Sequence, residues 1–167
     1  QFLHVEVNHN LGVARFPVNE LPSPHEDDGA AAAMWLSLLK GEQAVGKVRI
    51  AAKLSYVAGL DPHHQDLAFD ETNDHQPNEI RVAVCRARDL HPAHSRAMSC
   101  DAYVSLRLND PLSITHRTQT VLKTTHPVFN EIFAFEYHGE GHLELDVYDW
   151  HWTQDDELLG SCAVALD

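Results

Sequence analysis

Histidines are the residues of this sequence that most invite a chemical role, because there are 13 of them and several stand close together. The neighbouring pairs are His63 with His64, His91 with His94, and His138 with His142. Zinc requires three or four ligands that converge on a tetrahedron, and no pair stands beside cysteines or carboxylates at the spacing of a known zinc motif. We therefore interpret them as scattered surface histidines, whose protonation near pH 6 would offset part of the chain's negative charge.

No residue pattern in the sequence indicates catalysis. There is no glycine-rich phosphate loop, no nucleophile elbow and no HExxH zinc motif. Ser, His and Asp are so abundant that an imagined triad carries no weight. The three cysteines, Cys85, Cys100 and Cys162, are odd in number and far apart, which favours a reducing compartment over a disulfide framework. We therefore expect an intracellular protein without an active site.

The charge balance excludes some partners. The chain has 12 Lys and Arg against 25 Asp and Glu, a net charge of −13, and residues 58–77 are acidic with no basic residue. Phosphate backbones would repel such a chain, so we expect no nucleic-acid partner. The longest apolar run, near residues 30–36, is far shorter than the roughly 18 residues of a membrane span. The chain begins without Met inside a strand pattern and lacks a signal peptide, so we expect a fragment of a longer protein.

Alternation of apolar and polar residues predicts a protein built from strands. The predicted strands lie at residues 2–7, 11–18, 46–56, 80–84, 103–108, 132–137 and 143–148. Residues 19–29 resemble a polar loop, and Trp35–Leu38 fits either a helical turn or a short strand. No helical segment of useful length interrupts the strands, which is typical of an antiparallel β-sandwich.

The pattern of one strand pair occurs twice, because residues 2–14 align with residues 142–163 around a Leu-Gly step. In residues 79–167, five further motifs follow one another in an order known from one family. They are the strand and turn Ile80–Leu90, the Asp-x-Tyr-Val of Asp101–Val104, the Lys-Thr to Asn-Glu segment Lys123–Glu131, Leu145–Asp149, and Asp156–Gly160.

On these motifs, residues 79–167 resemble a C2 domain, and residues 1–56 resemble the closing strands of a preceding C2 domain. The resemblance implies an all-β fold, an antiparallel Greek-key β-sandwich. We divide the chain into residues 1–56, an acidic linker or long loop at 57–77, and a C2-like domain at 78–167 that lacks its last strand. The family has two permuted topologies, so residues 46–56 either end the first unit or open the second, with 57–77 as an inserted hairpin loop. We prefer the linker, because a hairpin loop of this length is unusual.

The resemblance also implies calcium ligands on the loops at one end of the sandwich, where carboxylates supply most of the about six to eight oxygens that calcium takes. Asp101 and Asp149 match the family's aspartates. The other positions depart from it, falling near His94 or Ser95, at His151, and at Glu157, with Asp155 and Asp156 close by. Imidazole is a poor calcium ligand. We expect at most a weak calcium site at Asp101, Asp149, Asp155, Asp156 and Glu157, and no other cofactor.

Membrane binding finds little support in the basic residues. The strand that carries a lysine cluster in calcium-independent lipid-binding relatives offers only Arg107, Arg117 and Lys123. Trp150 and Trp152 fall on the third loop, where they could contact a membrane interface or a protein partner. We favour the interpretation in which at least one of them packs over the base of the loop.

These observations favour a non-catalytic scaffolding module that binds a protein partner, independently of calcium, within a larger intracellular protein. By analogy with the family, such a protein would be cytoplasmic and associated with membrane trafficking, the cytoskeleton or the cilium. One alternative is a calcium-assisted module that docks on a phospholipid membrane. Another is a regulatory C2 domain of a larger lipid-signalling enzyme.

Overall fold

The structure is a computed structural model, and it describes most of the chain from residue 33 onward. The described residues are 2–3, 16–17, 33–55, 57, 78–92, 98–109, 113–138 and 141–166. They form eleven strands and no helix, so no described segment could cross a membrane as a helix, and the predicted all-β class is confirmed. The strands are β1 (Phe2–Leu3), β2 (Phe16–Pro17), β3 (Met34–Lys40), β4 (Gln43–Ser55), β5 (Glu79–Arg88), β6 (Cys100–Leu108), β7 (His116–Arg117), β8 (Val121–Thr124), β9 (Val128–Glu136), β10 (His142–Asp149) and β11 (Glu157–Ala165).

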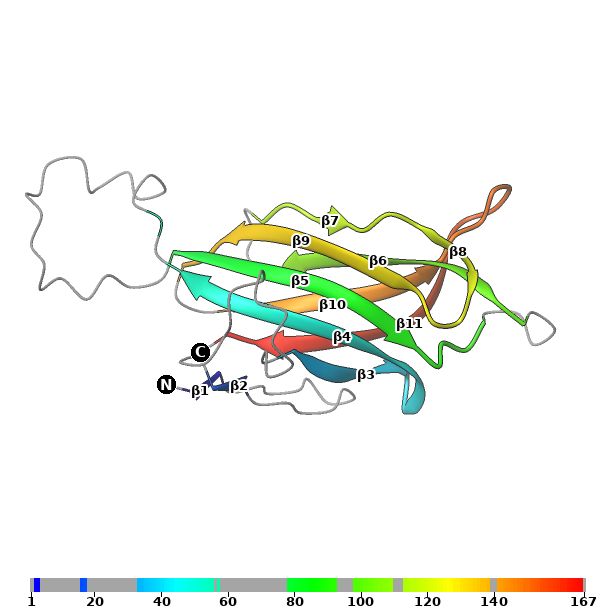
Figure 1. The fold of residues 1–167 in the computed structure, drawn as a ribbon, viewed down its shortest axis with the longest axis horizontal. Coiled ribbons are helices and arrows are strands. Elements are labelled where there is room, and N and C mark those ends of the chain that lie inside the picture. The colour runs from blue at the N-terminus through cyan, green and yellow to red at the C-terminus, as the bar shows by residue number, and fades with distance from the viewer. Residues whose placement is uncertain are drawn as a thin grey trace, which may run out of the picture.

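Nine of these strands form one antiparallel sheet that folds over on itself. Their order is β7-β6-β10-β11-β3-β4-β5-β9, with β8 paired to β6. Figure 1 shows β9, β5 and β4 as one layer and β6, β10 and β11 as the other, with β3 between β11 and β4. The predicted antiparallel sandwich is therefore confirmed, and β3 closes one of its sides.

Several strand predictions agree with this arrangement. Residues 80–84, 103–108 and 143–148 lie within β5, β6 and β10, and Trp35–Leu38 lies in β3, so the strand alternative was right there. Strand 132–137 overlaps β9, which begins earlier, at Val128, and ends at Glu136. In the predicted strand pair near the N-terminus, only β1 and β2 are described, and they pair antiparallel. The loop at 19–29, nearly all of the segment 57–77, and His63, His64 and His94 lie outside the described residues.

Strand β4 belongs to the same sheet as the strands that follow it. It pairs with β5 over nine register positions, from Lys47 opposite Arg88 to Ser55 opposite Glu79. On its other side it pairs with β3, which in turn meets β11 at Ser161 opposite Leu39. Of the two arrangements that the sequence left open for residues 46–56, this pairing is the one in which they open the sandwich of residues 79–166.

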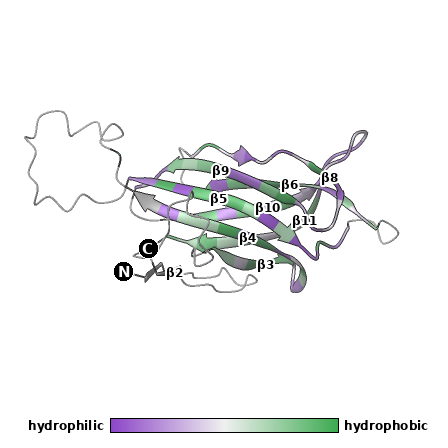
Figure 2. Cartoon of the chain, viewed as in Figure 1, coloured by the Kyte–Doolittle hydropathy of each residue, from purple (hydrophilic) through white to green (hydrophobic). Residues whose placement is uncertain are grey.

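The two layers enclose one apolar core, because every long strand turns alternate residues inward. Hydrophilic and hydrophobic residues alternate in this way along β5 (Figure 2). Leu38 from β3, Ile50 from β4, Ile80 from β5, Leu106 from β6 and Leu145 from β10 are all fully buried. Residues 34–50 therefore contribute to the same core as residues 79–166.

Gly160 lies where β11 packs against Leu38 of β3 and Val45 of β4. A Cβ at this position would lie 2.5 Å from Val45 Cγ2 and 3.3 Å from Leu38 Cβ, so a glycine is required for the two layers to meet there.

Candidate functional site

The candidate site lies where the expected calcium ligands lie, at the end of the sandwich formed by the start of β6 and the end of β10. Asp149 is the last residue of β10 and is only 5% exposed. Its Oδ1 accepts a hydrogen bond of 2.8 Å from the Asp101 amide, and the Trp150 amide donates to the Asp101 carbonyl oxygen at 2.8 Å. Asp101 Oδ1 accepts from the Lys123 amide at 2.7 Å. These two carboxylates therefore fasten β6, β8 and β10 to one another.

Asp156 fastens the loop between β10 and β11. Its Oδ2 accepts a hydrogen bond of 2.8 Å from the Tyr103 hydroxyl, and its Oδ1 accepts one of 3.0 Å from the His151 amide. Burial acts to raise the pKa of Asp156. The two hydrogen bonds and the positive charge of Arg117 outweigh burial and hold this pKa below its ordinary value of 3.8. The Asp156 carboxylate therefore joins the loop to Tyr103 on β6 and to the His151 amide within the loop.

Tyr103, which donates to Asp156, is itself held by contacts of its ring. Its ring stacks on Tyr148 with the centroids 5.3 Å apart, and the Arg117 guanidinium lies over the ring at 3.5 Å from the centroid. Burial, together with the hydrogen bond to Asp156, raises the pKa of Tyr103 to about 12. The hydroxyl therefore stays protonated at neutral pH and remains a hydrogen-bond donor to the loop.

The braced loop carries the two tryptophans of the predicted contact site. Their rings meet edge to face with centroids 5.7 Å apart and an interplanar angle of 82°. Trp150 is half-buried, whereas Trp152 is 84% exposed. The loop thus presents one large aromatic ring to solvent and supports it with a second.

The remaining predicted calcium ligands do not join Asp101 and Asp149. Glu157 lies 3.5 Å from Lys40 Nζ, Asp155 is exposed, and Asp156 is engaged by Tyr103 and His151. Within the part of the chain that the structure describes, no group of three or more His, Cys, Asp or Glu side chains could hold a metal ion. Calcium takes several converging oxygens, and the weak calcium site at these residues stays a prediction.

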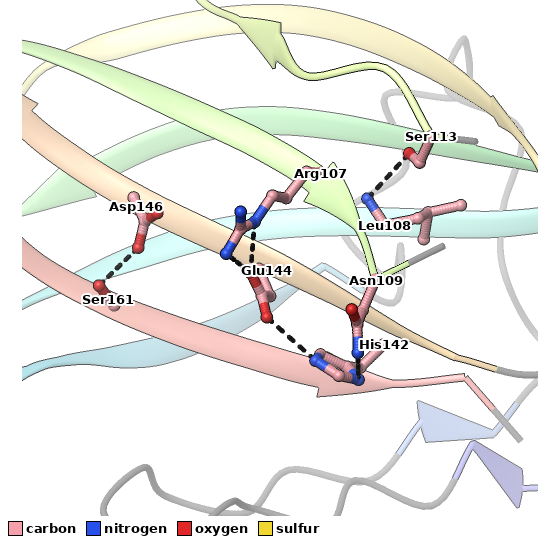
Figure 3. A network of polar contacts seen from close by, with 8 residues as sticks. All are labelled: Arg107, Leu108, Asn109, Ser113, His142, Glu144, Asp146 and Ser161. Atoms are coloured by element: carbon pink, nitrogen blue, oxygen red, sulfur yellow. Dashed lines mark hydrogen bonds and ion pairs between the residues drawn. The ribbon is translucent and has the colours of Figure 1, made fainter. Parts of the chain in front are cut away.

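Elsewhere on the sandwich, the outer face of β6, β10 and β11 carries charged side chains that pair with one another (Figure 3). The Arg107 guanidinium donates to Glu144, and His142 Nε2 lies 3.0 Å from the same carboxylate. The Ser161 hydroxyl donates to Asp146 at 2.5 Å. Arg107 is thus already neutralised within the fold.

A different set of basic residues, on β4 and β5, was not singled out from the sequence. Lys47, Arg49 and Lys53 alternate along β4 and face Arg88, Arg86 and Arg81 on β5. Their alternation is visible in the printed sequence, but only the register of the hairpin places them side by side.

With this geometry in view, comparison with known proteins identifies the family. The model of the family described as C2 domain matches residues 78–167. The chain belongs to the C2 domain family.

Among curated proteins, the relatives are much longer than this chain. The chain is 30% identical over 95 residues to the eye isozyme of protein kinase C from Drosophila melanogaster, covering 54% of this chain and 13% of that protein. It is 28% identical over 178 residues to multiple C2 domain and transmembrane region protein 7 of Arabidopsis thaliana, covering 94% and 17%. It is 31% identical over 105 residues to synaptotagmin-1 of Aplysia californica, covering 60% and 24%. The chain therefore spans less than a quarter of the length of these relatives.

Solved structures show the same fold. A C2 domain of the protein RIM from Drosophila aligns with a TM-score of 0.53 and 18% identity, over 72% of this chain and 85% of that one. A C2 domain of the protein RIM2 aligns with a TM-score of 0.53 and 23% identity, over 72% and 84%. Each match covers more of the chain than residues 78–167 alone, so part of the preceding segment shares the fold.

Proposed function

We propose that this chain is a non-catalytic C2 module that binds a protein partner through the β10–β11 loop, without calcium. Trp152 carries the proposal, because it is 84% exposed on a loop that Asp156 holds through Tyr103 and His151. Large exposed aromatic rings on a rigid support are typical anchors of protein interfaces. Each of the matched relatives is several times longer than this chain, which supports the part of the proposal that makes the module one portion of a larger protein. We propose that this larger protein is intracellular and that the module acts in it as a scaffold.

The contacts of the carboxylates support calcium independence. Both oxygens of Asp156 and the Oδ1 of Asp149 accept hydrogen bonds from amide and hydroxyl donors of the protein, and Glu157 lies beside Lys40. A calcium ion would have to displace these contacts before it gathered enough oxygens. These contacts support a loop that keeps its shape without a metal.

The test compares three kinds of ligand on the same protein. Calcium is titrated by calorimetry, phosphatidylcholine–phosphatidylserine vesicles are sedimented with and without calcium, and partners are captured from cell extract and then purified. We expect no heat of binding in the calcium titration and no calcium-dependent sedimentation with the vesicles. For a purified partner, Trp152→Ala should weaken binding about tenfold or more, since an anchor residue contributes about 2 kcal/mol.

The control is Ile114→Ala, which removes an exposed apolar side chain, 64% exposed, from outside the loop. Its affinity for the partner should stay close to that of the unchanged protein. Calcium-dependent sedimentation that Trp152→Ala abolishes would instead make the module a membrane-docking one. Equal losses in the two variants would remove the specific role of Trp152.

A further inference from the structure

Half of the basic residues of this acidic chain are gathered on one hairpin. Of 12 Lys and Arg, six occupy β4 and β5, in a protein of net charge −13. The register sets them directly opposite one another in three pairs, which we call the basic strip. The pairs are Lys47 opposite Arg88, Arg49 opposite Arg86, and Lys53 opposite Arg81.

All six side chains point away from the core. Val48 and Ile50 alternate with Lys47 and Arg49 on β4 and are fully buried, so the basic residues occupy the outer face of the strand. On β5, a bulge at Cys85 shifts the alternation by one residue, so that Arg86 points outward opposite Arg49. Five of the six are exposed and Arg49 is half-buried. The hairpin therefore presents two parallel rows of positive charge to solvent.

Folding does not account for this arrangement. Like charges directly opposite on neighbouring strands destabilise a sheet. Arg81 has Glu79 at 2.6 Å, and Arg88 has Asp89 at 3.7 Å and lies 4.3 Å from the ring centroid of Trp35. In the described part of the chain, Lys47, Arg49, Lys53 and Arg86 form no ion pair.

The contrast with the opposite layer is direct. There Arg107 is neutralised by Glu144 (Figure 3), whereas Lys47, Arg49, Lys53 and Arg86 of the basic strip form no ion pair with an acidic side chain of the described residues. An anionic ligand from outside the described residues would supply the missing charge.

The surroundings of the basic strip define the size of its ligand. Acidic residues border it at both ends, with Asp89 at one end and Glu79 and Glu136 at the other. Between these ends, Lys47 and Lys53 are about 20 Å apart along an extended strand. Ala51 and Ala83 face each other between the Arg49–Arg86 pair and the Lys53–Arg81 pair, and their small side chains leave the surface shallow there. The positive surface is therefore long and narrow.

We propose that the basic strip binds an acidic, extended segment of a protein partner. In an extended chain, alternate residues lie on one face about 6.8 Å apart, which matches the spacing of Lys47 and Arg49 along β4. Arginine binds carboxylates through two parallel hydrogen bonds. Four residues lie nearest the middle of the basic strip, and three of them, Arg49, Arg81 and Arg86, are arginines. A planar anionic membrane would also meet the acidic residues at both ends, so the narrow shape favours a peptide. The inference shares the protein partner of the proposed function but lies on other strands than Trp152.

The test measures fluorescence anisotropy of a labelled peptide of alternating Glu and Ser residues against the full chain. Binding should weaken about tenfold or more in Lys47→Gln/Arg49→Gln, and should weaken with added salt. The matched control is Arg107→Gln/Lys123→Gln, which changes the net charge equally but leaves the strip intact. Its affinity should stay within about twofold of the unchanged protein.

Further arms separate the alternatives. Phosphatidylserine vesicles and a labelled oligothymidylate are offered to the same variants, and tighter binding of either, uncompeted by the peptide, would overturn the peptide assignment. Equal losses in both double variants would reduce the effect to net charge. Thermal unfolding of Lys47→Gln/Arg49→Gln should show no loss of stability, because two like-charge contacts are relieved. Trp152→Ala should leave peptide affinity unchanged, so failure of the loop proposal and failure of this one are distinguishable.

Discussion

At the scale of single residues, carboxylates in this protein act as fasteners. Asp149 joins β6 to β10 through the Asp101 amide, and Asp156 joins the loop to Tyr103. The C2 resemblance implied at most a weak calcium site at the same residues. The distinction rests on what each oxygen contacts. Here hydrogen-bond donors of the protein contact both oxygens of Asp156 and one oxygen of Asp149.

Asp156→Asn should lower the free energy of unfolding at pH 7 by about 1 kcal/mol, because it removes the charge that two donors stabilise. The pKa of Asp156 is lowered in the fold, so its stabilisation is present above its ordinary pKa of 3.8 and is lost as pH falls below it. Urea unfolding at pH 7 and near pH 3 measures this. The difference between the two proteins should shrink in acid, and a difference that grew in acid would contradict the assignment.

At the scale of elements, the β4–β5 hairpin carries conflicting demands. Its inner face is apolar and supports the core, while its outer face places cations opposite cations. The apolar inner face stabilises the strand pairing, whereas the facing cations on the outer face weaken it. Such a conflict is typical of residues kept for binding rather than for stability.

Arg86→Glu should therefore raise the free energy of unfolding, by up to about 1 kcal/mol, because it sets opposite charges across from each other at Arg49. The same substitution should weaken binding of the acidic peptide. Denaturant unfolding and the anisotropy titration are run on one preparation. A variant that loses both stability and binding would show a structural role for Arg86 instead.

At the scale of the whole molecule, β3 and β4 complete the sandwich. β3 lies between β11 and β4 in the sheet order, and Leu38 from β3 is fully buried in the common core. We therefore propose that residues 34–55 and 79–166 form one folding unit, rather than the units 1–56 and 78–167 expected from the sequence. Gly160 contributes by letting β11 approach β3.

Leu38→Ala should cost about 2–5 kcal/mol, because it leaves a cavity in a fully buried position. If the unit is single, denaturant unfolding stays one transition, and hydrogen exchange accelerates in β5 and β10 as well as in β3. Val45 and Val48 lie in the same core, so their strand should respond with β3. Two separate transitions would favour two units.

The sequence by itself determined the all-β class, the position of most strands and the C2 resemblance of residues 79–167, because alternation at a period of two residues is a local signal. It also identified Trp150 and Trp152 as loop residues. Only the tertiary structure decided that β4 pairs with β5, that Lys47 faces Arg88, and that Asp156 meets Tyr103. Strand register and loop contacts join residues far apart in the chain, and alternation along one strand carries no information about which strand lies beside it.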